Sequence, residues 1–189
     1  MYLIMQSLKS YKKIIIFIFL YLIFSAHSPW GQYLAYRDQH LLIMSVIEDE
    51  ETYPYSKVLV EVINKYLPEA SARPARARTF ERVQSLFKTN QMPLVILSSK
   101  NAKALIKGNG PFKNFGSAEG LAIYYFNDLV LLAQPTFPSK FAWLVTKAIS
   151  DGKNELKGAK SPLDIKQPIK IHPGALEFLN NKEMPELKN

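Results

Sequence analysis

The sequence predicts an α/β fold with a mostly parallel open sheet flanked by helices. Short apolar runs at residues 40–47 and 93–98 alternate with segments whose apolar residues recur every three or four positions. Apolar residues make up 48% of the 189-residue chain, enough to bury a real core. Strands that alternate with helices are typical of parallel sheets with crossover connections.

The first half of the body predicts a strand, a helix and a weaker strand. Residues 40–47 contain the run LLIMSVI, which suits a strand buried on both faces. Pro68 ends the helix that follows. Its apolar stripe comprises Val58, Leu59, Val62, Ile63, Tyr66 and Leu67. Residues 70–77 predict an edge strand because Pro74 has no N–H to donate.

Two further helices and a third strand follow. Thr79 predicts the N-cap of a helix whose inward stripe is Phe80, Val83, Leu86 and Phe87. Residues 93–98 predict the third strand. A short helix over residues 100–107 is then expected to end at Gly108, since glycine adopts the left-handed conformation that closes many helices.

The second half predicts a hairpin and two more helices. Asn127 and Asp128 separate the apolar runs LAIYYF and LVLLAQ, as in a β-hairpin. A helix opens at Pro138, with Phe141, Leu144, Val145 and Ala148 facing inward. Residues 151–168 predict a polar surface connection. His172 precedes a last short helix, where we expect it to cap or pack rather than act as a base.

Composition argues against several functions. The net charge is +8, and +5 without Lys9, Lys12 and Lys13, which is too weakly basic to indicate nucleic-acid binding. There is no cysteine, so disulfides, thiol catalysis and cysteine-ligated metals are excluded. No HExxH, GxSxG or P-loop motif is present, and we expect neither an enzyme nor a cofactor.

The N-terminus predicts export. Basic residues at 9–13 precede the apolar run IIIFIFLYLIF, as in a secretory signal, and this run is short for a membrane span of roughly 20 residues. Residues 1–30 are therefore predicted to be a signal peptide or, if uncleaved, an N-terminal anchor in the membrane. A single periplasmic domain is expected over residues 35–181, with a flexible tail at 182–189.

Five stretches of the body carry a family resemblance. They are TYPYSKVLVEVINKYLP, ARTFERVQSLFKTNQMPLVILSS, NGPFKNF, LVLLAQPTFPSKFAWLVTKAIS and IKIHPGALEFL. In this order they resemble successive helices, strands and loops of TAXI-type solute-binding proteins, the receptors of one class of TRAP transporter. The His-Pro-Gly-Ala motif in the last stretch is the most specific of these matches. Together the stretches cover nearly the whole body after residue 40.

Two departures from the family qualify what the resemblance implies. Family members have two lobes, whereas this chain passes directly from the loop around Phe112 to the closing strand. The resemblance therefore implies one lobe of a type II periplasmic-binding-protein-like fold. The family's first loop is also glycine-rich, which lets backbone N–H groups approach an anionic solute. Residues 45–52 of this chain contain no glycine and carry four consecutive acids, Glu48, Asp49, Glu50 and Glu51.

The resemblance also implies a ligand site. Thr79, Ser98 and Ser99 fall where the family's pocket has polar groups, and Ser45 and Tyr53 complete the predicted site. Each of the first three also has a purely structural interpretation as a helix cap.

Charged clusters supply the other candidates. Arg73, Arg76, Arg78 and Arg82 predict a partner or anion patch, or simply a charged edge strand that resists aggregation. The acidic run at residues 48–51 favours the positive end of the helix that follows it. Alternatives are a hard-cation site, although the spacing matches no known calcium loop, and a contact for a basic partner.

These observations predict an extracytoplasmic binding protein derived from a TAXI-type receptor. It would bind an envelope protein partner, or a solute weakly. One alternative is a homodimeric transport receptor for a small organic acid, and another is a metal-binding accessory protein that uses the acidic run.

Overall fold

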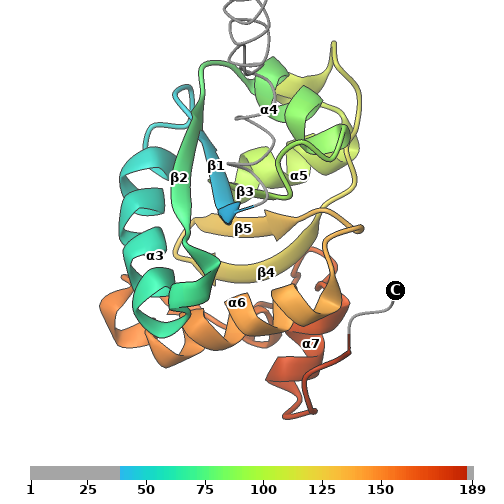
Figure 1. Ribbon diagram of the computed structural model, residues 1–189. Coiled ribbons are helices and arrows are strands. Elements are labelled where there is room, and N and C mark those ends of the chain that lie inside the picture. The colour runs from blue at the N-terminus through green and yellow to red at the C-terminus, as the bar shows by residue number, and fades with distance from the viewer. Residues whose placement is uncertain (1–38, 187–189) are drawn as a thin grey trace, which may run out of the picture. The chain divides into compact units, whose positions relative to one another are not determined.

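In the computed structural model, which describes residues 39–186, a mixed six-stranded sheet lies between two layers of helices (Figure 1). The strand order is β2-β1-β3-β5-β4-β6. The strands are β1 (Leu42–Val46), β2 (Arg73–Ala77), β3 (Leu94–Ser98), β4 (Leu121–Phe126), β5 (Leu129–Ala133) and β6 (Ala159–Lys160). The predicted signal peptide or anchor, residues 1–30, lies outside the described residues.

The helices divide between the two faces of the sheet. They are α3 (Thr52–Tyr66), α4 (Phe80–Lys88), α5 (Ser99–Lys107), α6 (Ser139–Asp151) and α7 (Pro173–Leu179). Side chains of α3, α6 and α7 form one apolar cluster with the sheet, and those of α4 and α5 form the other. All five residues of β1 are buried, as the apolar run predicts, because this strand lies between both layers. The α/β class is confirmed.

The expectation of a mostly parallel sheet is wrong for one half of it. Strand β1 pairs in parallel with β2 and with β3, but β5 runs antiparallel to β3, and β4 runs antiparallel to β5 and β6. The cause is the tight turn at Asn127 and Asp128, which reverses the chain between β4 and β5. Asn127 has a φ of 50°, a left-handed conformation that asparagine tolerates better than most residues. The returning strand β5 then docks beside β3.

Three smaller expectations also differ. Val58 and Tyr66 are 42% and 38% exposed, while Val60 is buried instead, because α3 packs against both the sheet and α6. Phe141 is 43% exposed and stacks on Phe137 rather than facing the core. Residues 151–168 are not only a surface connection, since they contain β6, which extends the sheet beside β4.

His172 caps the last helix, as expected. The residue is 1% exposed, and its Nδ1 accepts a hydrogen bond from the Gly174 N–H at 3.2 Å. Its Nε2 lies 2.9 Å from the Phe137 carbonyl oxygen, so the neutral tautomer that donates from Nε2 satisfies both partners. Burial lowers the pKa of His172, because the charged imidazolium is poorly solvated there.

The predicted tail begins with an ordered residue. Lys182 donates its N–H to the Glu177 carbonyl and accepts a hydrogen bond from the Trp143 indole. Residues 183–186 belong to no helix or strand. Among the helices of the described part of the chain, none is both long enough and apolar enough to cross a bilayer.

Candidate functional site

The parallel strands end together at one edge of the sheet. Val46, Ala77 and Ser98 are the last residues of β1, β2 and β3, and helices α3, α4 and α5 begin shortly after them. In open α/β sheets, ligands bind at the carboxyl ends of the strands. We call this edge, with Glu48, Asp49, Thr79 and Ser98, the strand-end site.

Thr52 shapes the loop that follows β1. Its hydroxyl lies 2.7 Å from the Asp49 carbonyl oxygen and 3.1 Å from the Val46 carbonyl oxygen, and it accepts the Val46 N–H at 3.3 Å. Thr52 is fully buried, so these contacts fix the loop tightly at its base. Sequence reasoning did not select this residue. A threonine directly after four acids could have indicated it, because threonine side chains often form hydrogen bonds with backbone groups close in the sequence.

Two of the four acids bind backbone N–H groups of the neighbouring elements. Glu48 Oε2 accepts the Phe80 N–H at 2.8 Å, at the first residue of α4. Asp49 Oδ2 accepts the Ser98 N–H at 2.8 Å, where β3 meets α5, and the Asn101 side-chain amide at 3.0 Å. Both carboxylates therefore occupy positions where helix N-termini attract anions.

Glu50 and Glu51 lie directly before α3, where the acidic run was expected to favour the positive end of that helix, but no carboxylate caps it. No acidic residue lies in the first turn of α3, and its N-cap residue, Glu51, makes no side-chain capping hydrogen bond. Glu48 and Asp49 interact with the starts of α4 and α5, because the loop folds back across the sheet edge toward them. Glu50 and Glu51 remain exposed.

The polar residues predicted from the family pocket are engaged in helix caps. Thr79 Oγ1 accepts the Arg82 N–H at 3.3 Å, and Ser98 Oγ accepts the Asn101 N–H at 3.3 Å. The Ser99 N–H donates to the Asp128 carbonyl oxygen across the β4–β5 turn. The strand-end site thus brings Thr79 and Ser98 together, but their side chains already serve the protein itself.

Ser45 and Tyr53 take no part in the hydrogen bonds that the strand-end site makes. Ser45 is fully buried within β1, and its hydroxyl donates to the Ala75 carbonyl oxygen at 3.0 Å. Tyr53 lies on α3 beside β2, where the Arg76 guanidinium carbon stands 4.5 Å from its ring centroid and the Lys57 ammonium 4.7 Å. Both cations therefore stack on this one ring.

The predicted arginine patch follows the outer edge of the sheet. Arg73 and Arg76 are exposed on β2, which is an edge strand as expected. Arg76, Arg78 and Arg82 line a groove between β2 and α4 that has Met44, Leu86 and Met92 as apolar lining. We call this the arginine groove.

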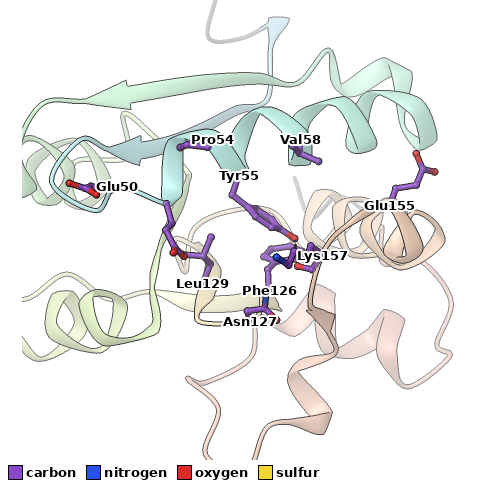
Figure 2. A pocket seen from close by; sticks show the side chains of 10 residues that line it. Glu50, Pro54, Tyr55, Val58, Phe126, Asn127, Leu129, Glu155 and Lys157 are labelled. Atoms are coloured by element: carbon purple, nitrogen blue, oxygen red, sulfur yellow. Dashed lines mark hydrogen bonds between the residues drawn. The ribbon is translucent and has the colours of Figure 1, made fainter.

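A second groove lies under the first half of α3, and we call it the acidic groove (Figure 2). Its apolar lining comes from Pro54, Tyr55 and Val58 on α3 and from Phe126 and Leu129 on the β4–β5 hairpin. Its charged lining comprises Glu50, Glu51, Glu155 and Lys157. Sequence reasoning did not find this groove, because its lining residues come from segments that lie far apart in the sequence, from Glu50 to Lys157.

Within residues 39–186, no three acidic or histidine side chains converge on a point that could hold a metal ion. Neither the known protein-family models nor the curated proteins provide a match to this sequence.

Proposed function

We propose that this chain is an extracytoplasmic binding protein derived from a TAXI-type solute receptor, and that it binds a protein partner rather than a small organic acid. The observation that carries this proposal is the pair of carboxylate contacts at the strand-end site. Glu48 and Asp49 hold the backbone donors of Phe80 and Ser98 at 2.8 Å each.

These contacts oppose the binding of an anionic solute in two ways. First, the Phe80 and Ser98 N–H groups, which could bind a solute carboxylate, are already satisfied. A side chain attached to the same loop competes at an effective concentration in the millimolar range or above, so a free solute must displace it. Second, the two carboxylates repel any further anion, by roughly 1 kcal/mol per charge at about 4 Å in water and more where solvent is thin.

A single lobe also offers a solute little cover. A good small-molecule pocket buries about 70–90% of its ligand's surface, which in a two-lobed receptor requires the second lobe. Thr79 and Ser98, whose hydroxyls accept capping hydrogen bonds here, add little affinity. The exposed residues just beyond the strand ends, such as Ile47, Glu48 and Arg78, are better suited to contact with another protein chain. We extend the proposal to location, because the basic and apolar N-terminal segment is typical of exported proteins.

Calorimetry on the full-length protein in mild detergent tests the proposal. We expect no measurable heat from a dicarboxylate such as succinate with the wild type. Asp49→Ala frees the Ser98 donor and removes one repelling charge, so weak binding that appears only in this variant would support a filled anion site. Glu50→Ala is the matched control, since it removes an equal charge without freeing a donor. Micromolar binding of succinate to monomeric wild type would refute the proposal.

A further inference from the structure

The acidic groove combines a rigid aromatic floor with exposed apolar walls. The rings of Tyr55 and Phe126 lie 5.0 Å apart at an interplanar angle of 41°. The Tyr55 hydroxyl donates to the Lys157 carbonyl oxygen at 3.0 Å and so ties α3 to the far wall. Val58 remains 42% exposed beside this floor. An occupant would therefore meet a preformed apolar surface and order few protein side chains on binding.

The charges that line the acidic groove are unusual for this protein. The described part of the chain carries more basic than acidic residues, yet three carboxylates and one ammonium line the groove. Among the described residues, the side chains of Glu50 and Glu51 have no hydrogen-bond or ion-pair partner. Their neighbour Glu48 has one such partner, and Asp49 has two. The loop thus engages two acids in hydrogen bonds to the protein and leaves two without such a partner beside the groove.

The acids stand at both ends of the apolar floor. Figure 2 shows Glu50 at one end and Glu155 at the other, with Tyr55 and Phe126 between them. Glu155 is already bound to the Lys65 ammonium and the Tyr66 hydroxyl, each at 2.7 Å. The end near Glu50 and Glu51 is therefore the stronger attractor for a cation.

We propose that the acidic groove is the docking site for an extended segment of a partner protein in which apolar side chains alternate with lysine or arginine. This inference rests on the proposed function and names its partner class. Apolar side chains of the segment would cover Pro54, Tyr55 and Val58, which are the lining residues that Phe126 supports from below. Its cationic side chains would face Glu50 and Glu51, whose charges are otherwise uncompensated.

Two other occupants fit the groove less well. A small organic acid would be repelled by the three carboxylates. A second copy of this chain could present the arginine groove, but that surface is also concave, and two hollows cannot pack against each other at the density of a specific interface. A flexible segment can enter a groove that a folded surface cannot.

Fluorescence polarisation with the full-length protein in mild detergent tests the docking site. The probe is a labelled peptide in which leucine and lysine alternate, compared with a leucine–glutamate peptide and a serine–lysine peptide. We expect binding of the first peptide only, because charge and apolar contact are both required. The affinity should fall with added salt, since exposed charges are screened.

Variants locate the contact. Glu50→Gln with Glu51→Gln removes the two free charges and should weaken binding by about tenfold, near the upper range for two exposed ion pairs. Glu61→Gln with Glu69→Gln removes two exposed acids that do not line the groove, and we expect no change. Val58→Ser keeps the charges but removes apolar contact, and should also weaken binding.

The possible outcomes separate this inference from the proposed function. Equal losses in both double variants would indicate nonspecific charge attraction and overturn the docking site. Failure of the leucine–lysine peptide to bind would do the same, while the anion test of the strand-end site stands independently. A wild-type dimer that dissociates in the Glu50→Gln, Glu51→Gln variant would identify a second copy as the occupant and also overturn the inference.

Discussion

Asp49 provides the sharpest test of how the strand-end site is built. Its Oδ2 accepts two hydrogen bonds, one from the Ser98 N–H and one from the Asn101 side chain, and so fastens the loop after β1 to the start of α5. The neighbouring Glu50 has the same charge but no such partner among the described residues. Substituting each residue in turn therefore separates specific hydrogen bonding from general electrostatics.

The expected loss of stability follows from the two hydrogen bonds that Asp49 accepts. A hydrogen bond to a charged group contributes about 1.5–3 kcal/mol, and its loss here is partly offset because Asp49 is only half-buried and water can reach the freed donors. Asp49→Ala should therefore cost about 2 kcal/mol. Asp49→Asn keeps an oxygen acceptor but loses the charge. Because charge-assisted hydrogen bonds are about twice as strong as neutral ones, this substitution should cost about 1 kcal/mol. Glu50→Ala should change stability by less than about 0.5 kcal/mol.

Urea unfolding followed by circular dichroism measures these differences through the shift in midpoint at constant slope. The order Asp49→Ala, Asp49→Asn, Glu50→Ala, from most to least destabilised, supports the capping geometry. Equal small effects in all three variants would refute it and return the whole acidic run to the role of a solvated charged loop.

Four other expectations are open to direct measurement. Burial lowers the pKa of His172, so below about pH 6.5 the unfolded chain takes up a proton that the folded chain resists. The stability due to neutral His172 is therefore complete above that pH and is lost as the pH falls. The melting temperature should drop more steeply toward pH 5 in the wild type than in His172→Asn. Gly174→Ala should destabilise by about 1–3 kcal/mol in thermal melts, because the new Cβ would lie 2.0 Å from the Ser139 carbonyl oxygen; an unchanged melting temperature would contradict this packing. Thr79→Ala should cost about 1 kcal/mol, while Thr79→Ser should restore most of it. Residues 1–30 should direct export, which fractionation with intact-mass analysis checks; full-length protein found only in the cytosol would count against it.

Local patterns predicted most individual elements. The apolar run of β1, the caps at Thr79 and Ser98 and the left-handed Gly108 each depend on residues close together in the chain, so the sequence carries their signals directly. Pro74 likewise marked β2 as an edge strand, because a missing N–H is tolerated only where a strand has a free side.

Long-range pairing was beyond the reach of these patterns. The hairpin at Asn127 was evident, but its sequence does not specify whether β4 or β5 pairs with β3, and that choice decides whether the pair with β3 is parallel or antiparallel. The exposure of Phe141 has a similar origin, since helical spacing defines a stripe without stating which neighbour covers each end of it. In both cases the missing information is the position of another element.

The acidic run shows the same limit within the candidate site. Four consecutive acids form one feature in the sequence, and helix electrostatics assigns them all to the helix that follows. The partners of Asp49 lie 49 and 52 residues away, so no local pattern could identify them.

The contacts of the acidic run explain why the strand-end site disfavours anions while the acidic groove beside it favours cations. Thr52 holds the base of the loop, which fixes the directions in which successive side chains leave it. Glu48 and Asp49 then neutralise the donors that would attract an anion, while Glu50 and Glu51 turn the adjoining apolar groove into an attractor for cations. A glycine-rich loop at this position would reverse both effects, because it would free the backbone donors and remove the outward charges together. In the proposed descent from a receptor with a glycine-rich loop, the acids would therefore change the sign of the preferred ligand and not only remove a site.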